Sequence, residues 1–142
     1  QYGEAELAPP PATLSRARYY QWMAYLTNSV QEALNQWFHP DHFVSGTQME
    51  SAFKKNAEKR LEKMWGNLDE ALSKSPYLLG DRFSACDAYL FSLTCWQTRL
   101  KKSMICERLN LARFFETVKN RPSVERTFEA EGIASWYSIN ND

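Results

Sequence analysis

The sequence predicts an all-α domain, a helical bundle wrapped around one buried central helix. The first indication is residues 84–100, where nearly every side chain between Ala88 and Trp96 is apolar. A helix that is apolar on almost all of its faces has to be covered by other elements. Two stretches with helical periodicity, at about residues 13–38 and 47–75, are long enough to cover it, and no strand pattern is present.

A start signal for the central helix lies at Ser84 and Asp87. The two residues stand three apart, which is the spacing of a capping box. In that motif the hydroxyl and the carboxylate each cover a backbone N–H of the other residue. A carboxylate there also lies at the positive end of the helix dipole. We therefore predict a structural capping role for both residues.

The first long helix is expected to start near Thr13 or Ser15 and to end at Phe38, because Pro40 stops it. Its apolar residues follow helical spacing and form one face, which consists of Leu14, Ala17, Trp22, Tyr25, Leu26, Val30, Ala33, Leu34 and Trp37. The other face is polar and carries Gln21, Asn28, Gln31, Glu32 and Asn35.

The second long helix is expected to open at Thr47, with Glu50 completing another capping box, and to end before Pro76. The carboxylates of Asp69 and Glu70 fall on its solvent side and are assigned no role. Its apolar stripe consists of Phe53, Ala57, Leu61, Met64, Leu68 and Leu72.

The C-terminal third is expected to contain two shorter helices. After a connection at residues 104–107, the pattern predicts helices at 109–119 and 123–131, the second closed by Gly132. The tail, residues 133–142, still holds the apolar side chains of Trp136, Tyr137 and Ile139, so we expect it to fold back over the body.

Composition argues against several classes of partner. The 17 basic and 17 acidic residues are interspersed, which leaves no electrostatic footprint for nucleic acid or for an anionic membrane. No apolar run approaches the roughly 20 residues of a membrane span. Of the three cysteines, Cys86 and Cys95 fall in the buried helix and Cys106 outside it. An odd number of cysteines fits a reducing compartment, so we expect a cytoplasmic protein; Cys106 is expected to be inert.

No catalytic or metal site is predicted. His39 and His42 flank Pro40-Asp41, but their spacing is too short, and the proline too stiff, for a pair on one helix. No nearby cysteine completes a zinc set, so we expect loop histidines and no metal. Nothing matches a nucleophile elbow, and the five glycines are scattered rather than gathered in a phosphate-binding loop.

Three motifs carry a resemblance to a known family. Residues 78–91 read Leu-Leu-Gly-Asp-Arg-Phe-Ser-x-x-Asp-Ala-Tyr-Leu-Phe. Residues 9–22 contain three prolines, then Arg-Ala-Arg-Tyr and a tryptophan. Residues 121–132 begin with Arg-Pro-Ser-Val and end with Glu-Ala-Glu-Gly. Together they resemble the all-helical C-terminal domain of soluble glutathione transferases, bacterial members most closely. The resemblance covers about residues 8–133 and implies that fold.

The resemblance also implies a domain organisation. Residues 1–12 end in consecutive prolines, which make a semi-rigid spacer, and read as a linker after a thioredoxin-like first domain that this chain lacks. Residues 13–142 then form the helical second domain. In this family the first domain activates the thiol of glutathione, the co-substrate, and makes nearly all contacts with it. We therefore expect no catalytic residue here and no activity from this chain alone.

The same resemblance implies candidate site residues and partners. The helical domain of such enzymes supplies a wall of the pocket for a small electrophilic or apolar ligand, and much of the interface of a homodimer, in a conjugation that serves detoxification. Carried over by position, the pocket candidates are Tyr25, Gln31, Glu32, Trp96 and Trp136. Each of them is also plausible as ordinary core or surface.

The first helix departs from the bacterial pattern. Beta-type members place an asparagine and then a histidine–lysine pair on this helix, and these residues help to hold glutathione; the matching positions here are Ala24, Gln31 and Glu32. Glutamine still donates and accepts hydrogen bonds, but Glu32 reverses a charge next to an anionic ligand. The glutathione site is thus altered, or the protein belongs to another subgroup.

Two other functions stay open. The same fold serves as a noncatalytic docking module in larger assemblies, and a stand-alone binder of a small apolar ligand could use the groove between the first and central helices.

Overall fold

The computed structural model describes residues 6–98 and 104–133 and confirms an all-α fold within them. A single isolated bridge, Tyr77 to Gly80, is the only β-type pairing in those ranges. None of the described helices is long and apolar enough to cross a membrane. The elements are α1 (Leu14–Tyr25), η2 (Leu26–Gln31), α2 (Glu32–Phe38), η3 (Pro40–His42), α3 (Thr47–Ala71), α4 (Ala85–Thr98), α5 (Leu109–Lys119) and α6 (Pro122–Glu131).

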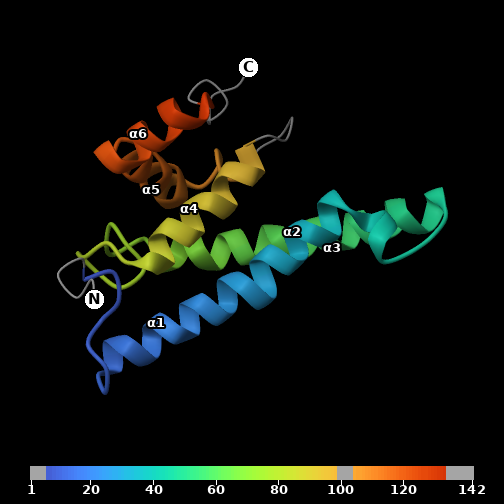
Figure 1. Ribbon diagram of the computed structural model, residues 1–142. Helices are drawn as coiled ribbons and strands as arrows, with labels where there is room; N and C mark the ends of the chain where they lie inside the picture. The colour runs from blue at the N-terminus through green and yellow to red at the C-terminus, as the bar shows by residue number, and fades with distance from the viewer. Residues whose placement is uncertain (1–5, 99–103, 134–142) are drawn as a thin grey trace.

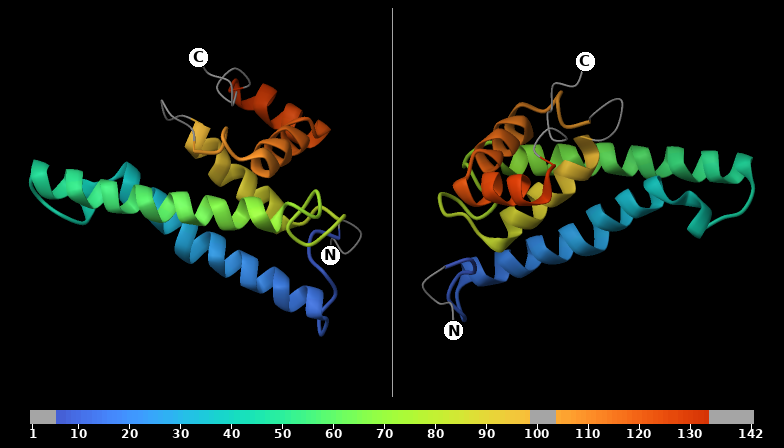
Figure 2. Two further views of the ribbon diagram at one scale, coloured as in Figure 1. Left: turned by 180° about the vertical axis from the view of Figure 1, so that it is seen from behind. Right: turned by 45° about the horizontal axis from the view of Figure 1, so that its top comes forward.

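The helices are arranged around α4. Elements α1, η2 and α2 run on from one another as a single long rod, and α3 returns beside its α2 end (Figure 1). Helix α4 crosses this pair, and α5 and α6 lie on its other side. Both views in Figure 2 show the turn between α2 and α3 projecting beyond the other helices.

The first rod contains a wider segment that the sequence did not predict. Residues 26–31 form a π-helix, η2, between the α-helical turns of α1 and α2. The Thr27 hydroxyl donates to the carbonyl of Met23 at 2.9 Å, and this bond competes with the α-helical use of that carbonyl. Short π-segments inside α-helices occur frequently at functional sites.

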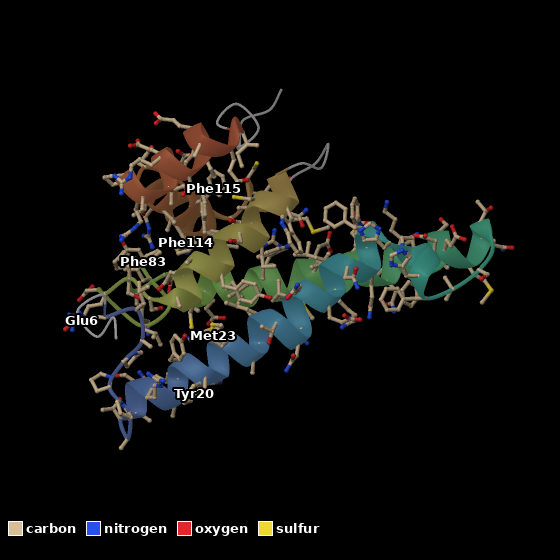
Figure 3. The ribbon with its side chains drawn as sticks, viewed as in Figure 1. Glu6, Tyr20, Met23, Phe83, Phe114 and Phe115 are labelled. Carbon is tan, nitrogen blue, oxygen red and sulfur yellow. The ribbon has the colours of Figure 1, made fainter. Side chains whose placement is uncertain are left out.

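The buried central helix is confirmed. Leu90 and Leu93 are fully buried, and so are the polar residues Asp87, Thr94 and Gln97. Side chains from α5 and α6 cover its far side, where the ring of Phe91 lies 5.2 Å from Phe115 and 6.1 Å from Phe128. Figure 3 shows Phe114 and Phe115 between α5 and α4.

Asp87 does more at the start of α4 than a capping box requires. Its Oδ2 accepts from the backbone N–H of Ser84 at 2.8 Å and from the Ser84 hydroxyl at 2.7 Å, while its Oδ1 accepts from the N–H of Leu78 at 2.9 Å. These are the hydrogen bonds that the predicted capping role of Asp87 requires. The reciprocal bond differs from the expectation, because the N–H of Asp87 donates to the Ser84 carbonyl at 3.1 Å while the Ser84 hydroxyl donates to the Asp87 carboxylate.

The segment before α1 packs against the start of α4. The carbonyl of Leu7 accepts from the N–H of Ala85 at 2.8 Å, one of the helix donors that have no partner inside the helix. Glu6 forms an ion pair with Arg82 in the turn before α4. Thr13 is the N-cap of α1, with its hydroxyl accepting from the N–H of Arg16 at 3.1 Å.

The start of α3 differs from the prediction. Gly46, not Thr47, is the N-cap, at a φ of 101° that favours glycine. The Glu50 carboxylate accepts from the N–H of Gly46 at 3.1 Å, so it caps one residue earlier than expected. Trp65, which the predicted apolar stripe omits, is fully buried and donates to Gln97 Oε1 at 3.3 Å.

Asp69 is a second correction, because it does not face solvent without a role. Its Oδ1 accepts from the N–H groups of Asn110 and Leu111, both at 2.9 Å, and its Oδ2 accepts from the Asn110 side chain at 3.0 Å. A carboxylate on α3 therefore caps α5 from 41 residues away in the chain. The spacing of residues along α3 does not predict this contact.

The apolar face predicted for the first helix is only partly buried. Leu26, Val30, Ala33 and Leu34 are completely buried, but α1 contains no buried residue and Leu14 is 71% exposed. Large contiguous apolar patches are uncommon on the surface of a monomeric protein and mark interaction sites.

The two C-terminal helices agree with the prediction. Helix α6 begins with Pro122 at its first turn, and Gly132 closes it in the left-handed conformation at a φ of 65°. The expected folding back of residues 133–142 concerns a segment that, apart from Ile133, lies outside the described residues.

We predict that replacing Asp87 with alanine lowers the free energy of unfolding by about 3 kcal/mol, because the buried N–H groups of Leu78 and Ser84 lose their acceptor. Ser84→Ala should cost about 1 kcal/mol. The matched control is Ser92→Ala on the exposed side of the same helix, expected to change stability by less than about 0.5 kcal/mol. Thermal and urea unfolding measure all three. A D87A melt equal to that of S92A would contradict the capping role.

Candidate functional site

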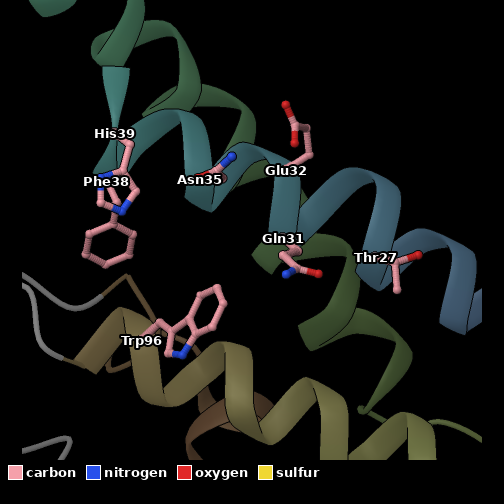
Figure 4. A pocket seen from close by; sticks show the side chains of 7 residues that line it. All are labelled: Thr27, Gln31, Glu32, Asn35, Phe38, His39 and Trp96. Carbon is pink, nitrogen blue, oxygen red and sulfur yellow. The ribbon is translucent and has the colours of Figure 1, made fainter. Parts of the chain in front are cut away.

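A groove of about 550 Å³ lies between the first rod and the central helix. One wall comes from η2, α2 and the residue that follows α2, and the other from Trp96 on α4 (Figure 4). This volume falls in the range typical of small-molecule sites. The lining residues are Thr27, Gln31, Glu32, Asn35, Phe38, His39 and Trp96.

Gln31 is held in place from the central helix. The Tyr89 hydroxyl donates to Gln31 Oε1, and burial raises the pKa of Tyr89, which keeps the phenol a neutral donor. In Figure 4 the amide nitrogen of Gln31 lies on the side of Trp96 and the oxygen on the opposite side. Gln31 thus presents an N–H donor to the groove.

Glu32 lies at the outer edge of the groove. Its carboxylate accepts from Gln36 Nε2 at 3.0 Å, and Gln36 Oε1 accepts from Arg60 Nη1 at 2.8 Å. Figure 4 shows the carboxylate directed away from Trp96. A ligand in the groove would therefore meet its charge at the rim rather than against the aromatic wall.

Trp96 lies on the exposed side of the central helix, with 39% of its surface exposed. It forms the aromatic wall opposite Gln31, and Phe38 closes the neighbouring end of the groove. The structure thus brings Gln31, Glu32 and Trp96, which the sequence proposed together, to one site.

Of the two remaining sequence candidates, Tyr25 lies elsewhere. Tyr25 is not among the groove residues; its hydroxyl accepts from Asn67 Nδ2 at 3.3 Å, and its ring packs edge-on against Trp22 at 5.9 Å. Trp136 lies outside the described residues.

Several lining residues were not among the sequence candidates. Thr27 and Asn35 stand four residues on either side of Gln31, a spacing that places them on one helix face. Asn35 belonged to the predicted polar face, so this periodicity was the available signal. Phe38 and His39 reach the groove only because of how the rod ends, and no sequence pattern indicates that.

His39, Asp41 and His42 gather at the end of the rod. The two imidazole rings stack with centroids 5.0 Å apart, and one ligand atom from each of the three residues lies within 4.8 Å of the others. The two histidines meet although they do not share a helix, because His39 precedes η3 as its N-cap.

The cysteines do not provide a catalytic thiolate in the groove. Burial and the neighbouring Asp87 raise the pKa of Cys86 to about 11, so the thiol stays protonated at neutral pH. The Cys86 thiol donates to the carbonyl of Tyr19 at 3.4 Å and thus joins α4 to α1. Cys95 is also buried, whereas Cys106 is exposed, and neither lines the groove.

The fold and the groove define an all-helical domain with a ligand-sized site between its first rod and a buried central helix. Residues 26–122 match the family profile described as "Glutathione S-transferase, C-terminal domain". The chain therefore belongs to the family of glutathione S-transferase C-terminal domains, and its relatives make it one of the bacterial type.

Relatives agree with this assignment along most of the chain. Glutathione S-transferase GstA of Escherichia coli O157:H7 is 28% identical over 131 residues, which are 92% of this chain and 61% of the relative. The structure of the bacterial beta class glutathione S-transferase of Sphingomonas chungbukensis is 28% identical with a TM-score of 0.78, covering 94% of this chain and 62% of that one. The structure of a ternary complex of BphK, a bacterial GST, is 25% identical with a TM-score of 0.80, covering 92% of this chain and 61% of that one. The chain spans about three-fifths of the length of these relatives.

Proposed function

We propose that this chain is the helical part of a glutathione transferase that conjugates glutathione to small electrophiles, and that it forms one wall of the electrophile site. The observation that carries the proposal is the groove in which Gln31 on the first rod faces Trp96 on the central helix. An aromatic wall with a few placed polar groups is typical of sites for small, largely apolar ligands.

The chemistry of the groove supports a division of labour with a second domain. Among the described lining residues, Thr27 carries the only hydroxyl, and this hydroxyl donates to the carbonyls of Met23 and Ala24. Its hydrogen bonds go to these carbonyls and to Asn28 Oδ1, not to Glu32 or His39 of the lining, so it is not an activated nucleophile. Thiolate activation is therefore assigned to residues beyond this chain, in keeping with its three-fifths coverage of the relatives.

We assign residues 1–12 to the linker between that thioredoxin-like domain and the helical domain of residues 13–142. The described part of the linker is attached to the body by the Leu7 carbonyl and by Arg16, whose Nη1 donates to the Pro9 carbonyl at 2.8 Å. Such anchoring would hold a preceding domain in one orientation.

The exposed side chains of α1 support an interface in the parent protein. Leu14 is 71% exposed and Tyr20 56%, and Leu7 in the segment before α1 is 47% exposed. We assign this surface to contacts with the first domain and with the second subunit of a homodimer. The same surface favours the second candidate function, a noncatalytic docking module. We place the protein in the cytoplasm, where Cys86 and Cys95 stay reduced.

The isolated chain should not conjugate glutathione to 1-chloro-2,4-dinitrobenzene, whereas the parent protein should, because the groove lacks a group that forms the thiolate. The assay follows the absorbance of the conjugate at matched concentrations. Turnover by the 142-residue chain would contradict the division of labour. An inactive parent that copurifies with a macromolecule would favour the docking module.

Replacing Trp96 with alanine in the parent should lower kcat/KM for the electrophile about tenfold, the loss of one aromatic contact of about 1.4 kcal/mol. The matched control is Phe43→Ala, because Phe43 is 41% exposed and lies outside the groove. Steady-state kinetics measure both, and thermal melts check that both variants are folded. Equal effects of the two substitutions would contradict a role of Trp96 as a ligand wall.

Replacing Gln31 with alanine in the parent should raise the KM for glutathione about fivefold with little change in kcat, since one neutral hydrogen bond contributes about 1 kcal/mol. Tyr89→Phe should shift KM in the same direction by less, because it releases the amide without removing it. Gln48→Ala, an exposed glutamine at the start of α3, is the control. A KM unchanged in Q31A would remove Gln31 from the glutathione site.

A further inference from the structure

The turn that joins the two long helices holds three metal-ligand side chains together. These side chains lie in its first part, His39 to His42, which directly follows α2, and the turn projects from the bundle (Figure 2). The N–H of His42 donates to the carbonyl of His39 at 3.1 Å, and the N–H of Phe43 donates to that of Pro40 at 3.0 Å. These bonds define the 3-10 helix η3.

The hydrogen-bonded turn explains why the histidines meet. His39 is the N-cap of η3, at a φ of −128° and a ψ of 58°, so it stands just outside the 3-10 helix. Its carbonyl accepts the first hydrogen bond of the turn, from the N–H of His42, and this bond holds the two residues close together. The rings of His39 and His42 lie nearly parallel, with 12° between their planes.

Asp41 adds a carboxylate to the two imidazoles. Its Oδ2 lies 3.8 Å from Nε2 of His42, and ligand atoms of all three residues lie within 4.8 Å of one another. Ligands bound to one ion at about 2.0–2.2 Å stand roughly 3–3.5 Å apart. All three side chains are exposed, so small rotations bring the ligand atoms to that separation.

We propose that His39, Asp41 and His42 form a binding site for a divalent transition-metal ion such as Zn²⁺, Ni²⁺ or Co²⁺. Two imidazole nitrogens and one carboxylate oxygen suit these ions, whereas Mg²⁺ and Ca²⁺ prefer sets made of oxygen alone. Three protein ligands leave at least one position of the ion open to water or to another ligand.

The location of the site connects the ion with the groove. His39 is shared between the ligand cluster and the groove lining, beside Phe38. A bound ion would lie at the rim of the groove and add positive charge at the end remote from Thr27. This inference goes beyond the proposed transferase function and does not depend on it.

The test is a calorimetric titration of the tag-free 142-residue chain with ZnCl₂, with MgCl₂ as the comparison ion. A Cys106→Ser background removes the exposed thiol, which could bind Zn²⁺ by itself. We expect one Zn²⁺ per chain and no Mg²⁺ binding. His39→Ala and His42→Ala should each weaken Zn²⁺ binding tenfold or more, at least the cost of losing an outer-shell partner.

The carboxylate has its own matched control. Asp41→Asn should weaken Zn²⁺ binding, whereas Asp81→Asn, which changes another exposed aspartate in the turn before α4, should not. Circular dichroism checks that each variant keeps its helices. Absence of Zn²⁺ binding, or one-to-one binding that survives in the H39A/H42A double variant, would overturn the proposal.

Absorption spectroscopy with Co²⁺ provides a second measurement of binding that does not depend on calorimetry. On addition of CoCl₂, d–d bands stronger than those of aqueous Co²⁺ and shifted to longer wavelength should appear in the Cys106→Ser chain and in D81N, and should be lost in H39A and H42A. Bands that persist in both histidine variants would place the ion elsewhere and overturn the assignment.

Discussion

The carboxylate of Asp87 is the constraint on which the rest of the structure depends. It is fully buried and accepts hydrogen bonds from Leu78 and Ser84, which belong to the turn before the central helix. Burial raises the pKa of Asp87, and the donors of Leu78 and Ser84 act in the opposite direction. An unpaired carboxylate in this position would be costly, so the turn and the helix form together.

Fixing the start of α4 also fixes which of its faces meets the first rod. Trp96 follows Asp87 by nine residues, or two and a half turns, and therefore lies on the opposite face of the helix. Tyr89 precedes Trp96 by about two turns and shares its face. One face of α4 thus presents both the phenol that holds Gln31 and the indole that walls the groove.

The widened turns of η2 supply the other side of the groove. The π-helix spans Leu26–Gln31, and both Thr27 and Gln31 line the groove from it. A wider helix shifts the residues that follow it relative to a regular α-helix, so their positions depend on this segment. In a family whose members share a fold but differ in ligands, such a segment is a place where the site can change while the core stays the same.

Sequence and structure differ most clearly in how the helix ends are satisfied. The signals at Ser84–Asp87, Thr13 and Gly132 were readable because each partner lies within a few residues, where spacing defines geometry. Asp69 carried the same chemistry, but its partners are at the start of α5, 41 residues away. Spacing along the chain says nothing about such a pair.

The candidate site divides in the same way. Gln31, Glu32 and Trp96 were proposed from the resemblance to a family, and Asn35 shares the polar periodicity of the first helix. The stacking of His39 on His42 depends on the turn after α2, where the histidine before the 3-10 helix meets the histidine at its end. The sequence by itself therefore determined the helices, most of their caps and the identity of the buried central helix, since these depend on local periodicity and capping. Only the tertiary structure decided which faces meet across the groove, because that follows from contacts between residues far apart in the chain.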